Sequence, residues 1–105
     1  MGLACFYLMA NRKNGAIHAG ATRDMLRRDW EHKTKTNRDS FTARYDCNRL
    51  VYVEFYNSLR DAVARENAVK RWKREWKIAL IEKDNPDWFN IALDAIDLDR
   101  NGFMP

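Results

Sequence analysis

Residues 16–33 read AIHAGATRDMLRRDWEHK, a short apolar run followed by a stretch with helical spacing. We expect Gly20 to end the apolar run, since a glycine permits the tight backbone turn that would lead into a helix. Arg28 and His32 are four residues apart, so a helix projects both side chains from one face. This strand–turn–helix corner therefore combines anion-binding and acid–base groups, as a phosphate-handling site requires.

The chain has 105 residues, enough for one domain with one modest core. Its 46% hydrophobic content and four tryptophans argue against disorder. We expect a single domain at residues 1–95 and a frayed tail at residues 96–105. No apolar run reaches membrane-spanning length, and the first residues lack the features of a signal peptide. Cys5 and Cys47 have no CxxC spacing, which favours reduced thiols in a cytoplasmic protein.

Three runs of sequence have the composition of strands. Leu3–Met9 and Ala16–Thr22 flank Asn14-Gly15, a strong turn signal, and together they predict a β-hairpin. Residues 49–55, RLVYVEF, are rich in β-branched and aromatic side chains and predict a third strand. Residues 35–48 are polar and lack periodicity, which predicts a loop between the first helix and this strand.

Two further helical patterns follow the third strand. Ser58 is expected to cap the first of them, with Asp61 at the third following position in a capping-box arrangement. The second continues towards residue 83 until Pro86 ends it, and residues 85–93, NPDWFNIAL, are expected to dock as a tail. The predicted fold class is therefore α+β: a small antiparallel three-stranded sheet flanked by helices, in the order β-β-α-β-α-α.

Glu66 is the clearest departure from pattern on the helix after Ser58. Four apolar residues are predicted to form a stripe on one face of this helix: Leu59, Ala62, Val63 and Val69. Glu66 lies in the middle of that stripe. A carboxylate turned towards a core is costly unless it is paired or binds a metal ion. The alternative is a pair between Glu66 and Lys70, four residues later, at the margin of the core.

The net charge is +4, and much of the excess falls within residues 60–77. Such a cluster suits a polyanion, with nucleic acid ahead of a membrane, whereas the alternative is a solvated helix face. The expected nucleic-acid contacts are basic residues of the first helix, the loop and the later helices: Arg27, Lys33, Arg44, Lys70, Arg71, Lys73 and Arg74. We expect the tryptophans to belong to the core rather than to platforms for base stacking.

Seven short motifs follow one another over residues 5–91. They are Cys5-Phe6-Tyr7, His18-Ala19-Gly20, the pattern AT-x-D-x-L-x-R-x-x-x-H at 21–32, LVYVE at 50–54, Ala64-Arg65-Glu66, KRWKREWKIALIE at 70–82 and NPDW at 85–88. In this order they resemble the GIY-YIG nuclease superfamily. The resemblance is close to its short bacterial stand-alone members, which are similar to the N-terminal domain of the excision-repair incision subunit.

The resemblance implies hydrolysis of phosphodiester bonds in DNA with one bound divalent ion, Mg²⁺ or Mn²⁺. By motif position, Tyr7 helps to activate the attacking water, and Arg28 steadies charge on the phosphate. His32 matches a site position that is histidine or tyrosine in several branches. Glu66 matches the metal-binding carboxylate, which would account for an acid on an apolar stripe.

The second motif departs from the family pattern, because His18 stands where the family has tyrosine. An imidazole can hold or deprotonate a water molecule near neutral pH. The change equally suits a catalytically impaired module of the same fold that binds nucleic acid. A third interpretation makes His18, His32 and Glu66 the ligands of a transition metal. The asparagine that some members use has two candidates here, Asn85 and Asn90.

Overall fold

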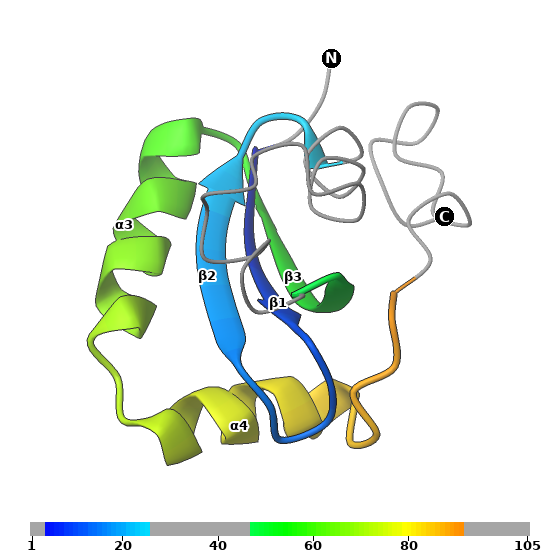
Figure 1. Cartoon of the computed structure of the whole chain (residues 1–105). Helices are drawn as coiled ribbons and strands as arrows, with labels where there is room; N and C mark the ends of the chain where they lie inside the picture. The colour runs from blue at the N-terminus through cyan, green and yellow to red at the C-terminus, as the bar shows by residue number, and fades with distance from the viewer. Residues whose placement is uncertain (1–3, 26–46, 92–105) are drawn as a thin grey trace.

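The computed structural model describes residues 4–25 and 47–91 of the chain. Its elements are β1 (Ala4–Ala10), β2 (Ile17–Thr22), β3 (Arg49–Tyr56), α3 (Leu59–Lys70) and α4 (Arg74–Asp84). The strands form one antiparallel sheet in the order β2-β1-β3, with α3 beside β2 and α4 across one end of the sheet (Figure 1). The α+β prediction is confirmed. The predicted helix at 23–33 and loop at 35–48 lie almost entirely outside the described residues.

The hairpin turn between β1 and β2 is held by polar contacts to its backbone. Asn14 has φ 58°, the left-handed conformation that asparagine tolerates. The side-chain oxygen of Asn11 accepts a hydrogen bond of 2.8 Å from the Ala16 N–H. A Cβ at Gly15 would lie 1.9 Å from that same oxygen, so only glycine fits there. The turn predicted from Asn14-Gly15 is confirmed, although the connection is longer than a two-residue turn.

β1 is the central strand and is buried on both faces, with every residue at most 3% exposed. One face carries Phe6 and Leu8, which pack with residues of β3, α3 and α4, namely Val51, Val69 and Ile81. The other face carries Cys5, Tyr7 and Met9, which pack with Met25, Cys47 and Leu50. Burial on two faces explains why the first run of the sequence is continuously apolar instead of alternating.

Helix α3 begins as the sequence predicts, but its buried face is rotated from the predicted stripe. The Ser58 hydroxyl accepts a hydrogen bond of 3.2 Å from the Asp61 N–H, which confirms the N-cap. Ala62 and Val69 are buried, whereas Val63 is 36% exposed. Including Val63 in the apolar stripe was therefore wrong. The helix is rotated about its axis, so that the side carrying position 65 faces the sheet.

The segment after α4 docks against the outer edge of β3. The Ile91 N–H donates to the Leu50 carbonyl at 2.8 Å, and the Leu50 N–H donates to the side-chain oxygen of Asn90 at 2.9 Å. Trp88 is fully buried and donates from its indole to Glu82. The docked tail is thus confirmed within residues 85–91, and it covers backbone groups that an edge strand would otherwise expose.

Candidate functional site

Tyr7 and His18 lie side by side on the same face of the sheet. Tyr7 is opposite Gly20 in the β1–β2 register and Met9 is opposite His18, so these side chains share one face. The ring centroids of Tyr7 and His18 are 6.1 Å apart. The β1–β2 pairing therefore brings together the two residues of the first and second motifs.

Gly20 has a different role from the predicted one. β2 continues through it to Thr22, so the prediction that Gly20 ends the strand was wrong. A Cβ at this position would lie 2.3 Å from the Tyr7 hydroxyl oxygen and 2.4 Å from the ring carbon that bears it. The Tyr7 ring lies directly over the glycine backbone, and this close approach is what requires the glycine.

Tyr7 and His18 differ in their access to the surface. Tyr7 has no exposed surface, and the described residues that pack with it on this face include Met9 and Cys5. His18 is half-buried. His18 is therefore the member of the pair that solvent or a ligand can reach, while Tyr7 lies behind it.

Glu66 stands on α3, with its side chain only 16% exposed. Its carboxylate is 2.5 Å from the ammonium nitrogen of Lys70, so the alternative pair between these two residues is formed. A carboxylate suits Mg²⁺ or Mn²⁺, because such ions bind through one or two carboxylates and keep several waters. The Glu66 carboxylate is thus chemically suited to a hard divalent ion, which would displace the Lys70 ammonium.

The sheet limits where Glu66 and His18 can meet. Tyr7 and His18 share one face, whereas α3 places Val69 in the core of the opposite face. α3 contacts β2 more extensively than it contacts the other strands, and it runs alongside this edge strand (Figure 1). A site that uses both His18 and Glu66 would therefore lie along the β2 edge of the sheet.

The transition-metal interpretation stays a prediction, because His32, one of its three ligands, lies outside the described residues. Residues 4–25 and 47–91 contain no group of three or more His, Cys, Asp or Glu side chains that could hold a metal ion. Several predicted site residues lie outside these ranges: Arg27, Arg28, His32, Lys33 and Arg44.

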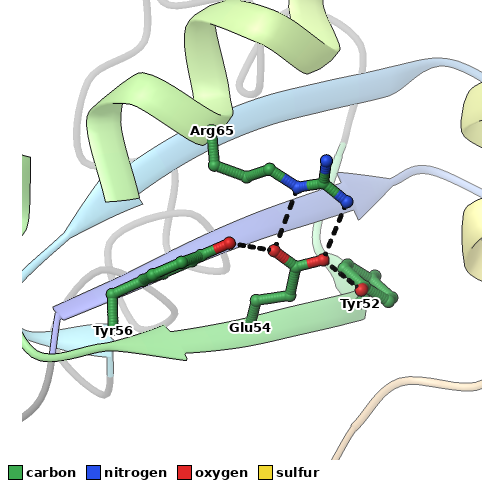
Figure 2. Close-up of polar contacts among 4 residues, drawn as sticks. All are labelled: Tyr52, Glu54, Tyr56 and Arg65. Carbon is green, nitrogen blue, oxygen red and sulfur yellow. Dashed lines mark hydrogen bonds and ion pairs between the residues drawn. The ribbon is translucent and has the colours of Figure 1, made fainter. Parts of the chain in front are cut away.

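A half-buried polar cluster that was not predicted from the sequence joins α3 to β3 (Figure 2). Arg65 donates from Nε and Nη2 to the two carboxylate oxygens of Glu54, each at 3.1 Å. The hydroxyls of Tyr52 and Tyr56 donate to the same carboxylate, Tyr56 at 2.6 Å. The Arg65 guanidinium also lies 5.1 Å from the Trp72 ring centroid. Every acceptor oxygen of Glu54 therefore has a partner.

This cluster fixes the charge states of its members. Burial acts to raise the pKa of Glu54, but hydrogen bonds from Arg65, Tyr52 and Tyr56 outweigh it, and the pKa of this carboxyl lies below its ordinary value. Burial and the Glu54 carboxylate raise the pKa of Tyr56 to about 12, and the pKa of Tyr52 shifts in the same direction. The hydrogen bond to Glu54 raises the pKa of Arg65. The pair is thus ionised, and both tyrosines are neutral, at physiological pH.

The sequence contained one signal for this cluster. Tyr52, Glu54 and Tyr56 alternate along RLVYVEFY, so a strand turns all three to one face. A carboxylate among aromatic residues on a strand requires a cationic partner. Arg65 became identifiable as that partner only when the packing of α3 against the sheet was known.

The predicted basic contacts on α3 and α4 have varied partners. Lys70 pairs with Glu66, and Arg74 donates from Nη2 to the carbonyls of Asn14 and Gly15 in the hairpin turn, at 2.8 and 2.7 Å. Lys73 and Arg71 are exposed. Arg74 therefore contributes to the fold as well as to the positive charge of this end of the molecule.

Both candidate asparagines form hydrogen bonds with backbone groups of β3. Asn85 donates from its side-chain nitrogen to the Val51 carbonyl at 3.1 Å, and Asn90 accepts from the Leu50 N–H. β3 is separated from β2 by the central strand, so both asparagines lie at the opposite edge of the sheet from His18.

Both cysteines belong to the described part of the chain, and they form no disulfide. Each is buried, and burial raises the pKa of the Cys5 thiol to about 12. Among the described helices, neither α3 nor α4 has the length and apolar character needed to cross a bilayer.

Comparison with known proteins identifies the family. The family model of the GIY-YIG catalytic domain matches residues 3–79, which extend from the start of the sheet into α4. No curated protein and no solved structure matches the chain. The matched region includes Tyr7, His18 and Glu66. The chain therefore belongs to the GIY-YIG family of nucleases, which act on nucleic acid and generally depend on a divalent metal ion.

Proposed function

We propose that this protein is an endonuclease that hydrolyses phosphodiester bonds in DNA with one divalent ion, Mg²⁺ or Mn²⁺. The observation that carries the proposal is the juxtaposition of Tyr7 and His18 across β1 and β2, at a centroid distance of 6.1 Å. Family membership makes nucleic acid the substrate class, and the accessible imidazole supplies a group that exchanges protons near neutral pH.

We assign to His18 the role of accepting a proton from the attacking water. Its half-buried imidazole can accept a proton from a water molecule at the surface of β2. The buried Tyr7 ring packs over Gly20 beside it and restricts where the imidazole can lie. In the family tyrosine occupies position 18, so this chain would perform the proton transfer with a more readily titrated group.

We assign stabilisation of the negative charge on the phosphate to Arg28 and to the divalent ion that Glu66 would hold. Arg28 would bind the scissile phosphate through its guanidinium, with His32 on the same helical face. Glu66 would hold the divalent ion, whose contribution when bound is to stabilise negative charge on the phosphate oxygens. The carboxylate is suited to this role because it lies beside Lys70 and is only partly exposed.

The proposal is tested by nicking of supercoiled plasmid DNA with Mg²⁺ or Mn²⁺, compared with branched and single-stranded DNA. Glu66→Gln removes the carboxylate, and Glu75→Gln is the matched control, since Glu75 is an exposed acid on the next helix. We expect metal-dependent cleavage in the wild type and the control, and its loss in Glu66→Gln. Equal cleavage by all three proteins would remove Glu66 from the site.

A second candidate function is a module that binds nucleic acid without cutting it. Two observations favour it: Tyr7 has no exposed surface, and the Glu66 carboxylate is paired with the Lys70 ammonium. Salt-sensitive DNA binding without cleavage under any metal condition would establish this alternative.

A further inference from the structure

Trp76 does not belong to the core. It is 52% exposed, whereas Trp88 is fully buried and Trp72 is packed against the core. The expectation that the tryptophans are core residues was therefore wrong for Trp76. A single exposed apolar side chain is ordinary on a protein surface, so only the surroundings of the ring can indicate a ligand.

The ring of Trp76 packs against the ring of Trp72. It meets the Trp72 ring edge-to-face, with centroids 6.1 Å apart and an interplanar angle of 77°. Trp72 in turn lies beneath the Arg65 guanidinium, which Glu54 holds by two hydrogen bonds. Trp76 is thus positioned by a chain of packed groups that begins at the sheet.

The surroundings of Trp76 are strongly cationic. Residues 70–77 read KRWKREWK, with five cations and one carboxylate, Glu75. The ammonium nitrogen of Lys73 lies 5.8 Å from the Trp76 ring centroid. Arg74 holds the hairpin turn, which carries the exposed Arg12, against this end of α4. Lys13 of the same turn is paired with Asp87 at 3.9 Å. We call Trp76 with Arg71 and Lys73 the aromatic–basic patch.

We propose that the aromatic–basic patch binds single-stranded nucleic acid, with an unpaired base stacked on Trp76 and the adjacent phosphates on Lys73 and Arg71. Stacking on an aromatic ring flanked by cations is how proteins hold unpaired bases. The cations around the ring favour a polyanion over an apolar protein surface. This inference rests on the proposed function, because it assigns a second contact with the same nucleic-acid substrate, at a place separate from the catalytic residues.

The test measures binding of the full-length chain to a fluorescent 12-nucleotide single strand and to a blunt duplex of the same sequence, with EDTA present to prevent cleavage. Trp76→Ala removes the ring, and Trp76→Phe restores a smaller one. Phe89→Ala is the matched control, because Phe89 is 67% exposed and lies outside the basic stretch. We expect Trp76→Ala to weaken single-strand binding by roughly tenfold, with a smaller effect on the duplex.

The other variants define the remaining outcomes. Trp76→Phe should retain binding within about threefold of the wild type, and Phe89→Ala should leave binding unchanged. Unchanged single-strand binding by Trp76→Ala overturns the patch alone and leaves the nuclease proposal standing. A wild type that binds neither oligonucleotide also overturns the patch, and metal-dependent nicking of plasmid DNA decides the nuclease proposal separately. A blue shift of tryptophan emission with anionic vesicles, absent in Trp76→Phe and not produced by the oligonucleotide, would assign the ring to a membrane instead.

Discussion

Arg65 and Glu54 form a two-point ion pair that fastens helix α3 to strand β3 (Figure 2). The side chains are 30% and 20% exposed, so the pair is partly shielded from water. Arg65 directly precedes Glu66, and its attachment limits rotation of the helix about its axis. The pair therefore links the stability of the fold to the direction in which Glu66 projects.

Removing one partner of this pair should destabilise the protein. Arg65→Met leaves the Glu54 carboxylate half-buried without its cation, and we expect a loss of about 2–3 kcal/mol in the free energy of unfolding, below the range for fully buried pairs. Arg65→Lys keeps the charge but loses the two-point geometry, so its loss should be smaller. Urea denaturation measures both. Equal stability of Arg65→Met and the wild type would show that the pair contributes nothing.

The same cluster should make stability depend on pH in the acid range. The pKa of Glu54 is lower in the folded protein than in the unfolded chain, so the unfolded state binds the proton first as the pH falls. The stabilisation is present above the unfolded value of about 4.3 and is lost as the pH decreases through the folded value. Glu54→Gln should be less stable than the wild type at pH 7, and this difference should shrink below about pH 4. A difference that stays constant with pH would contradict this assignment.

Gly20→Ala should destabilise the sheet because the new methyl group would overlap the Tyr7 ring. We expect a loss of about 1–3 kcal/mol, the usual cost of overpacking. The effect should depend on the ring. In a Tyr7→Leu background, Gly20→Ala should cost less, and a double-mutant cycle by thermal or chemical denaturation measures the coupling. Additive effects would mean that the close approach is not what requires the glycine.

The sequence predicted the local features of this fold well. Asn14-Gly15 identified the hairpin and Ser58 identified the start of α3, because each of these structures depends on neighbouring residues. The ion pair between Glu54 and Arg65 could not be predicted in the same way. It joins a strand to a helix, and it depends on the angle at which α3 packs.

The candidate site was only partly predictable for a related reason. The sequence predicted the hairpin, and the register of that hairpin in the structure brings Tyr7 beside His18. The sequence could not show that Tyr7 is buried and His18 accessible, because burial depends on what covers that face of the sheet. It also could not distinguish the exposed Trp76 from the buried Trp88, because exposure depends on how α4 and the segment after it pack.

Lys70 should compete with the metal ion for Glu66. Its ammonium lies 2.5 Å from the carboxylate and is itself 53% exposed, so the pair is weak enough to be displaced. Lys70→Ala should therefore tighten Mn²⁺ binding by about two- to fivefold, as expected from removal of a surface pair. Calorimetric titration measures the affinity, with Lys77→Ala as a control for the loss of one positive charge. Equal tightening in both variants would indicate a general charge effect instead of competition at Glu66.

In the proposed nuclease, Glu66 and His18 serve one metal-assisted site along the β2 edge. The direct measurement is the broadening of the His18 imidazole NMR signals when Mn²⁺ is added, since a paramagnetic ion broadens nearby protons. We expect broadening in the wild type and in Glu75→Gln, and its loss in Glu66→Gln. Broadening that persists in Glu66→Gln, or a wild type that cleaves DNA with Mn²⁺ while the His18 signals stay sharp, would contradict this proposal.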